Sequence, residues 1–465
     1  MLHDRRRALH ARIVEAIEAL YPDRLVEQVE RLAHHAFRGE VGEKAVTYLR
    51  QAGAKALGHS AYRETVTFFE QALTALHPLP DSRQKVERAI DLRLDLRQAL
   101  FPLNELAPAW RYLEEAEGLA RTLDDSRRLG WVSAYMSGHH LHTGGHVREV
   151  RAFAHTVEAI AERLDDAALR IAAQYYVAHA SHLAGDSRRA EDVCRRLMRS
   201  LRDQPTRERF GLAVHPAVMS RGHLARILAE RGVFDEGDAH GHEAIRIAED
   251  LDHPFSAVVG SLDLAYLKSV RGQLSPAAHI LERAVAQSRE WNFTSQTPTA
   301  MASLGYVYAW SGRIDEGVAS LQHAVTAHER AGIGAYLSVS VTRLGEAYLL
   351  ANQVEDARSC ADRALRLARG RGERVSEAWV LRLLGDIASH RAIPDVATAS
   401  AHYGAAMTLA SELEMRPLVA HCHAGLGRLY RLTDNPEQAQ EHLTTAGTMY
   451  SEMGMTYWSE RLEKG

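Results

Sequence analysis

Small residues recur along the second half of the chain at an almost constant spacing. Ala or Gly occupies six positions separated by steps of 40, 40, 40, 40 and 42 residues: Ala225, Ala265, Gly305, Gly345, Gly385 and Gly427. A fixed period in this range is typical of chains built from stacked structural repeats, each of which contacts only its neighbours. The spacing therefore predicts one elongated repeat array, although a chain of 465 residues could otherwise form several globular domains.

Two further sets of residues follow the same period. Seven positions after each small residue stands a residue expected in a turn: Gly232, Gly272, Gly312, Asn352, Ala392 and Asp434. Five positions later comes a second small residue: Gly237, Ala277, Gly317, Ala357, Ala397 and Ala439. The segments between them, such as 299–309 and 313–330, carry apolar residues three and four positions apart, which indicates helices. Each repeat is therefore predicted to be an antiparallel helix pair, with small residues where the two helices approach most closely.

The details of these pairs resemble the tetratricopeptide repeat. The pattern Leu-Gly-x-x-Tyr begins at Leu304, Leu344 and Leu426. The usual tetratricopeptide unit has about 34 residues, so the period of about 40 implies longer helices. The resemblance implies an all-α fold, a right-handed α-solenoid. Weaker copies around Ala178, around Gly138 and at 83–123, with an earlier second helix at 61–73, bring the expected total to about ten helix pairs.

The repeat pattern predicts the organisation of the whole chain. We expect an amphipathic N-terminal helix in 1–22, repeats in 23–201 and 217–455, and a capping helix with a short tail in 456–465. The segment 202–216 contains Pro205 and Pro216 and interrupts the pattern. It is expected to form an irregular loop at which the solenoid bends.

The N-terminal region has a second resemblance. Segments 5–17, 30–37 and 43–53 are similar to the junction between the ATPase module and the repeats of bacterial multidomain regulators. Those regulators combine a class III adenylate or guanylate cyclase, a signal-transduction ATPase and tetratricopeptide repeats. The resemblance implies that residues 1–22 are a remnant of that junction and that the repeats are a sensor acting on an ATPase or cyclase module. No Gly-Lys pair exists in the chain, so the phosphate-binding loop of such ATPases is absent.

Composition narrows the function classes. A net charge of −4 and a pI near 6.7 argue against broad nucleic-acid binding. No apolar run approaches the length of a membrane span, and residues 1–7 lack the apolar stretch of a secretion signal. Cys194, Cys360 and Cys422 are expected to be reduced packing residues. The sequence thus predicts a cytoplasmic protein with no membrane partner.

Candidate binding residues follow from the helical register. In tetratricopeptide arrays the first helix of each pair lines the concave face, and one side of that helix comprises fixed offsets from the small residue. Aromatic and Arg side chains at these offsets are the types that anchor interfaces. The predicted groove residues are Tyr135, His139, His142, Tyr175, His179, His182, Arg226, Tyr266, Tyr306, Trp310, Glu346, Trp379, Arg382, Asp386, Arg428 and Arg431.

Twenty-six histidines raise the question of a metal site. His139, His142, His179 and His182 share inward offsets in successive repeats and could converge on an ion. There is no Cys partner, no His-Glu-x-x-His motif and no evident carboxylate to orient the rings, so we predict no metal and no cofactor. The pair His34 and His35 is interpreted as helix packing.

These observations predict a non-catalytic scaffold that binds a peptide or a partner protein in the concave groove. No catalytic motif is present to suggest an enzyme. A small-molecule sensor, with an internal pocket between Tyr175, His179, Arg226 and Tyr266, is the alternative. The helix at 3–20 could also pack back on the repeats or mediate a homodimer.

Overall fold

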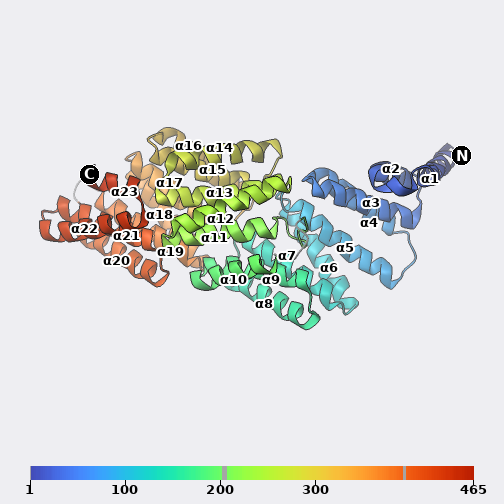
Figure 1. Ribbon diagram of the computed structural model, residues 1–465, viewed down its shortest axis with the longest axis horizontal. Helices are drawn as coiled ribbons and strands as arrows, with labels where there is room; N and C mark the ends of the chain where they lie inside the picture. Colours follow the sequence, from blue (N-terminus) through green and yellow to red (C-terminus); the bar gives the residue numbers. More distant parts are fainter. Residues whose placement is uncertain (1, 202–206, 391–393, 465) are drawn as a thin grey trace.

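The computed structural model describes residues 2–201, 207–390 and 394–464 and forms one elongated helical body (Figure 1). The N-terminus and the C-terminus lie at opposite ends of this body. No strand occurs in the described ranges, and the fold is a right-handed, tetratricopeptide-like α-solenoid.

The helices follow one another along the chain with short connections. The first part contains α1 (Leu2–Leu20), the 3-10 helix η1 (Pro22–Gln28), α2 (Val29–Arg38), α3 (Gly42–Gly58), α4 (Tyr62–Leu76), α5 (Arg83–Leu100), α6 (Leu106–Thr122), α7 (Ser126–Thr143), α8 (Val147–Leu164), α9 (Ala167–Leu183) and α10 (Ser187–Ser200). The second part contains α11 (Pro216–Arg231), α12 (Phe234–Asp250), α13 (Pro254–Arg271), α14 (Leu274–Glu290), α15 (Thr297–Trp310), α16 (Ile314–Arg330), α17 (Leu337–Leu350) and α18 (Val354–Arg371). The chain ends with α19 (Arg374–Ser389), α20 (Val396–Glu412), α21 (Arg416–Leu432), α22 (Pro436–Met453) and α23 (Thr456–Lys464).

Helices α3 to α22 form ten antiparallel pairs, which agrees with the predicted number. The predicted second helix at 61–73 corresponds to α4, and the weak copy at 83–123 corresponds to α5 and α6. The periodic small residues lie where the helices of a pair touch. A Cβ atom added to Gly305 of α15 would lie 2.8 Å from the carbonyl oxygen of Gly317 in α16. This close approach explains why a small residue recurs at the position in each repeat.

The predicted turn residues end the first helix of each pair. Gly232 and Gly272 have φ values of 79° and 91°, in the left-handed region that a Gly adopts without steric cost. Asn352 and Asp434 adopt the same region with φ values of 59° and 56°. Ala392, predicted at the equivalent position, lies outside the described residues.

Contacts between distant repeats close the superhelix on itself. The backbone N–H groups of Gly334 and Ala335 both donate to the carbonyl oxygen of His142 at 2.9 Å. Arg188 Nε donates to Glu414 Oε1 at 2.6 Å, although the two residues are 226 positions apart. A Cβ atom on Gly232 would collide with Met453 Sδ. Repeats about 200 residues apart in sequence therefore contact one another directly.

The two ends and the central interruption differ in how they pack. Helix α1 buries Val14 and Ile17, so it packs back on the array and leaves Leu9 and Leu20 exposed. Helix α23, the predicted capping helix, is anchored by the Trp458 indole, which donates to the carbonyl oxygen of Val270. The predicted loop at 202–216 falls partly on 202–206, outside the described residues. Its described part, 207–215, buries Phe210, Leu212 and Val214 inside the superhelix.

Candidate ligand-binding channel

Three adjoining cavities lie along the inside of the closed superhelix. The central cavity is bounded mainly by α9, α11, α13, α15, α17, α19, α21 and α23, and it shares His182 and Tyr336 with an N-terminal cavity. It shares Glu346, His421 and Trp458 with a C-terminal cavity. With open solvent included, their empty space is about 1140 Å³ (N-terminal), 800 Å³ (central) and 1350 Å³ (C-terminal). We refer to the three together as the axial channel.

Thirteen of the sixteen residues predicted from the register line the axial channel. His142, Tyr175, His179 and His182 line the N-terminal cavity. His182, Arg226, Tyr266, Tyr306, Glu346 and Trp379 line the central cavity. Trp310, Glu346, Arg382, Asp386 and Arg428 line the C-terminal cavity. The register therefore brings these side chains to one continuous interior surface, and their role in binding remains a prediction.

Aromatic rings form much of the wall of the central cavity. The wall comprises residues from four helices and from the connection before α17: Tyr266, Tyr306, Tyr336, Trp379 and Trp458. Tyr336 precedes α17 and has a left-handed backbone with a φ of 57°. The indole Nε1 of Trp379 is buried and has no hydrogen-bond partner among the described residues. Flat apolar walls with a few polar atoms are typical of small-ligand and peptide sites.

Most charges in the channel are neutralised by partners from neighbouring repeats. Arg226 Nε donates to Asp263 Oδ1 at 2.7 Å, and both side chains are buried. Arg382 bonds to Glu346 at 2.6 Å and to Asp386 at 2.5 Å. These ion pairs neutralise buried charges and give them hydrogen-bond partners. The pairs Arg226–Asp263 and Arg382–Glu346 also link the first helices of neighbouring repeats.

Arg343 is an exception in the central cavity. Its Nη1 donates to Ser303 Oγ at 2.9 Å, and its guanidinium carbon lies 5.0 Å from the centre of the Tyr306 ring. Over the described ranges, no carboxylate oxygen lies within 4.0 Å of its guanidinium group. Burial lowers the pKa of Arg343. An arginine at such a site is still protonated at neutral pH, so it carries a positive charge that no carboxylate contacts directly.

The N-terminal cavity contains a similar group. The Arg97 guanidinium lies 4.5 Å from the Phe101 ring centre and 4.6 Å from that of Tyr135. No ion pair of Arg97 with a carboxylate is found in the described part of the chain. Burial lowers the pKa of His142 to about 3 and that of His179 to about 4, with the nearby arginines adding to the effect. His142 and His179 are therefore neutral at neutral pH, and Arg97 carries a positive charge in this cavity.

Three predicted groove residues do not line the channel. Tyr135 donates to the carbonyl oxygen of Gly211 at 2.6 Å, because the loop at 207–215 folds over it. His139 packs against Trp110 in a tilted arrangement, with ring centres 4.7 Å apart, outside the cavities. Arg431 is exposed at the end of α21. Register alone places all three on the concave side, but the loop, a neighbouring ring and the helix end give each a different environment.

Several channel residues are absent from the prediction. Glu230 and His421 occupy inward offsets, so the register could have identified them. Arg343 lies just beside the predicted face of α17, and its position follows only from the packing of α15 against that helix. Tyr336 and Trp458 come from a connection and from the last helix, for which the repeat pattern gives no signal.

The metal site considered at His139, His142, His179 and His182 is not formed. His142 Nε2 lies 2.9 Å from Asn104 Oδ1, and His182 Nε2 lies 2.8 Å from Glu230 Oε2. His179 stacks on His223 with ring centres 4.1 Å apart. These rings are held by protein partners and by stacking, so they do not converge on one point.

Comparisons with known proteins agree with this architecture. No protein-family profile matches the chain. A curated protein described as "Uncharacterized protein R02095" of Rhizobium meliloti (strain 1021) is 24% identical over 396 residues, which cover 82% of this chain and 37% of that protein. The chain thus spans little more than a third of the length of this curated relative.

Two solved structures share the fold. A Rap protein complexed with Competence and Sporulation Factor is 15% identical, with a TM-score of 0.59, and the match covers 79% of this chain and 98% of that one. The Rap conjugation gene regulator of the plasmid pLS20 in complex with the Phr* peptide is 12% identical, with a TM-score of 0.51, and the match covers 78% and 95%. At these identities the likeness shows the fold, a tetratricopeptide-like helical solenoid. No helix in the described part of the chain has the length and apolar character needed to cross a membrane.

Proposed function

We propose that the chain is a non-catalytic interaction scaffold that binds a short extended peptide in the axial channel. The observation that carries this proposal is that most of the predicted concave residues line adjoining cavities inside a closed superhelix. Contacts such as the hydrogen bond from Gly334 to His142 join distant repeats across the array. An extended segment needs much less room and can present side chains to several repeats at once.

The two Rap structures support a peptide as the ligand. One was solved with Competence and Sporulation Factor and the other with the Phr* peptide, and both share the solenoid fold. At least one protein with this solenoid fold therefore binds a peptide.

The charges of the channel indicate what the peptide carries. Arg343 and Arg97 lack carboxylate partners and lie on aromatic rings. A carboxylate from the ligand, either an acidic side chain or the C-terminus, would form charge-assisted hydrogen bonds with Arg343. Aromatic or apolar ligand side chains would pack on Tyr266, Tyr306 and Trp379.

Selection from a library of short peptides tests the proposal. We expect selected peptides to be rich in acidic residues, and Arg343→Met to weaken their binding at least tenfold in fluorescence anisotropy. Arg431→Ala is the matched control, because Arg431 is exposed and lies outside the channel. Peptides that bind both variants as tightly as the unmodified chain would contradict the proposal.

A small-molecule inducer is the second candidate ligand. The central cavity, with its aromatic walls and a guanidinium that has no carboxylate partner, suits a compact aromatic carboxylate. Thermal-shift measurements with a panel of such acids distinguish the two candidates. Stabilisation by a metabolite but by no selected peptide would favour the inducer.

We further propose that the ligand signal passes to an ATPase or cyclase module. Support comes from the resemblance of the N-terminal segments to the ATPase–repeat junction, and the curated relative is a longer protein than this chain. Affinity capture from the host followed by mass spectrometry tests this partner. We expect to recover an ATPase or a cyclase in an amount comparable to that of the captured chain. Failure to recover either enzyme would contradict the proposal.

Helix α1 could also support a homodimer. Leu9 and Leu20 are 57% and 71% exposed, which leaves an apolar strip on the terminal helix. Light scattering of the full chain and of a Leu9→Glu/Leu20→Glu variant tests this idea. A dimer that becomes a monomer in the variant is expected, and equal masses would contradict it.

A further inference from the structure

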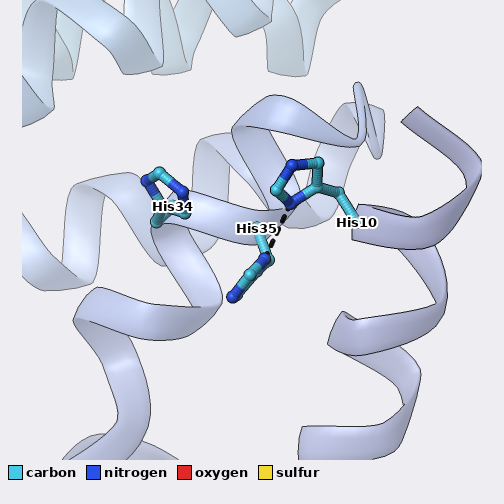
Figure 2. A group of neighbouring side chains, drawn as sticks. All are labelled: His10, His34 and His35. Atoms are coloured by element: carbon cyan, nitrogen blue, oxygen red, sulfur yellow. Dashed lines mark hydrogen bonds between the residues drawn. The ribbon is translucent and has the colours of Figure 1, made fainter. Parts of the chain in front are cut away.

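Three histidines gather between the first two helices, far from the axial channel. His10 projects from α1 toward α2, where His34 and His35 stand side by side (Figure 2). One ring nitrogen from each residue can be chosen so that all three lie within 4.8 Å of one another. In the described part of the chain no other group of three His, Cys, Asp or Glu residues meets this condition.

The spacing of the rings fits a common metal ligand set. The ring centres are separated by 5.0 Å (His10–His35), 5.1 Å (His34–His35) and 5.9 Å (His10–His34). Zinc binds imidazole nitrogens at about 2.0–2.1 Å, so two nitrogens of a tetrahedral site lie roughly 3.3 Å apart. His10 Nδ1 and His35 Nδ1 are 2.8 Å apart and need to separate only slightly. His34 is exposed and free to rotate toward the other two rings.

Two factors act on an ion at this site in opposite directions. Metal ions bind imidazole in its neutral form, which is the ordinary form of a histidine at neutral pH. The positive charges of Arg31 and Arg38 act on the same rings and would repel a cation. We therefore expect binding that is weaker than at a closed structural zinc site with four protein ligands.

We propose that His10, His34 and His35 bind one transition-metal ion of the class that prefers imidazole ligands, such as Zn²⁺, with the remaining coordination position open to solvent. The donor set contains no thiolate and no carboxylate, which favours Zn²⁺, Ni²⁺ or Cu²⁺ over Mg²⁺ or Ca²⁺. Exposed α1 side chains outnumber buried ones, and only Val14 and Ile17 are buried among its described side chains. A metal bridge would therefore strengthen the attachment of α1 to α2.

The chain contains a built-in control for this site. His423 Nδ1 and His442 Nδ1 are also 2.8 Å apart, and their ring centres are separated by 5.0 Å. This pair reproduces the geometry of His10 and His35 but does not belong to a group of three. A variant of this pair therefore shows how much Zn²⁺ affinity two neighbouring histidines provide without a third ligand.

Calorimetric titration of the tag-free full chain with Zn²⁺ tests the proposal. We expect saturable uptake of one ion per chain, unchanged in His442→Ala and weakened at least tenfold in His34→Ala. His34 is exposed, so its substitution should leave the fold intact. The absence of saturable heat, or equal binding by His34→Ala and the unmodified chain, would overturn the proposal.

Hydrogen exchange supplies a second measurement. Zn²⁺ should slow amide exchange in α1 of the unmodified chain and of His442→Ala, but not in His34→Ala. Equal protection in all three proteins would mean that the ion acts elsewhere, and would also overturn the proposal.

Discussion

The indole Nε1 of Trp458 donates a hydrogen bond to the carbonyl oxygen of Val270 at 3.0 Å, across 188 residues of chain. The same tryptophan lines both the central and the C-terminal cavities. The last helix therefore closes the superhelix and forms part of the channel wall with one side chain. Closure and ligand binding should be coupled for this reason.

Removal of this closure should loosen the channel before it unfolds the protein. Trp458→Ala loses one hydrogen bond and a partly buried ring, together roughly 1–3 kcal/mol. The expected result is faster amide exchange in α23 and at the end of α13, with weaker ligand binding. Trp291→Ala is the control, because Trp291 is 39% exposed and lies outside the channel. Unchanged exchange in α13 would show that Trp458 does not hold the turns together.

Two arginines of the central cavity should respond to the same substitution with opposite effects on stability. Arg343→Met removes a charge that has no carboxylate partner, so the free energy of unfolding should stay constant or rise. Arg226→Met leaves the buried Asp263 without its partner and should cost about 3–5 kcal/mol. Urea unfolding of both variants measures the difference.

The comparison also isolates the role of Arg343 in binding. If Arg343→Met binds the ligand less tightly but is at least as stable as the unmodified chain, Arg343 serves ligand binding and does not stabilise the fold. If Arg343→Met is destabilised as strongly as Arg226→Met, the guanidinium is a structural group, and the proposed ligand contact fails.

The sequence predicts the solenoid well because its signals are local. Gly305 marks a close approach of two helices, and Gly272 marks a turn with positive φ. The residues that determine the structure of each repeat therefore lie within that repeat. Closure depends on contacts between residues about 200 positions apart, such as Arg188 with Glu414, and no periodic pattern encodes these. The same reason explains why Trp458, Tyr336 and the loop over Tyr135 could not be anticipated.

The close approach at Gly305 leads to a prediction about the array itself. Gly305→Ala places a Cβ atom 2.8 Å from the Gly317 carbonyl oxygen, so the helix pair must separate at a cost of roughly 1–3 kcal/mol. Gly404→Ala is the matched control, because no atom lies within 4 Å of its added Cβ in the middle of α20. The control should gain up to about 1 kcal/mol from its better helix propensity. The midpoint of thermal unfolding should therefore fall for Gly305→Ala and rise for Gly404→Ala. Equal shifts in the two variants would contradict the packing role of Gly305.

Acid should destabilise the protein through buried neutral histidines. Burial, aided by Arg97, lowers the pKa of His142 to about 3, whereas an unfolded histidine titrates near 6.5. Between these values the unfolded chain binds a proton that the folded chain does not, so stability is full above pH 6.5 and falls as the pH falls toward 3. From pH 7 to 5.5 the contribution of His142 should be a loss on the order of 1 kcal/mol.

Urea unfolding at the two pH values measures this loss. His142→Gln should reduce the pH dependence, because glutamine does not titrate and can still reach Asn104 Oδ1, which lies 2.9 Å from His142 Nε2. His59→Gln provides the control for the histidine-to-glutamine change itself, since His59 is exposed and lies outside the channel. If His142→Gln loses as much stability on acidification as the unmodified chain does, His142 is not a source of the acid sensitivity.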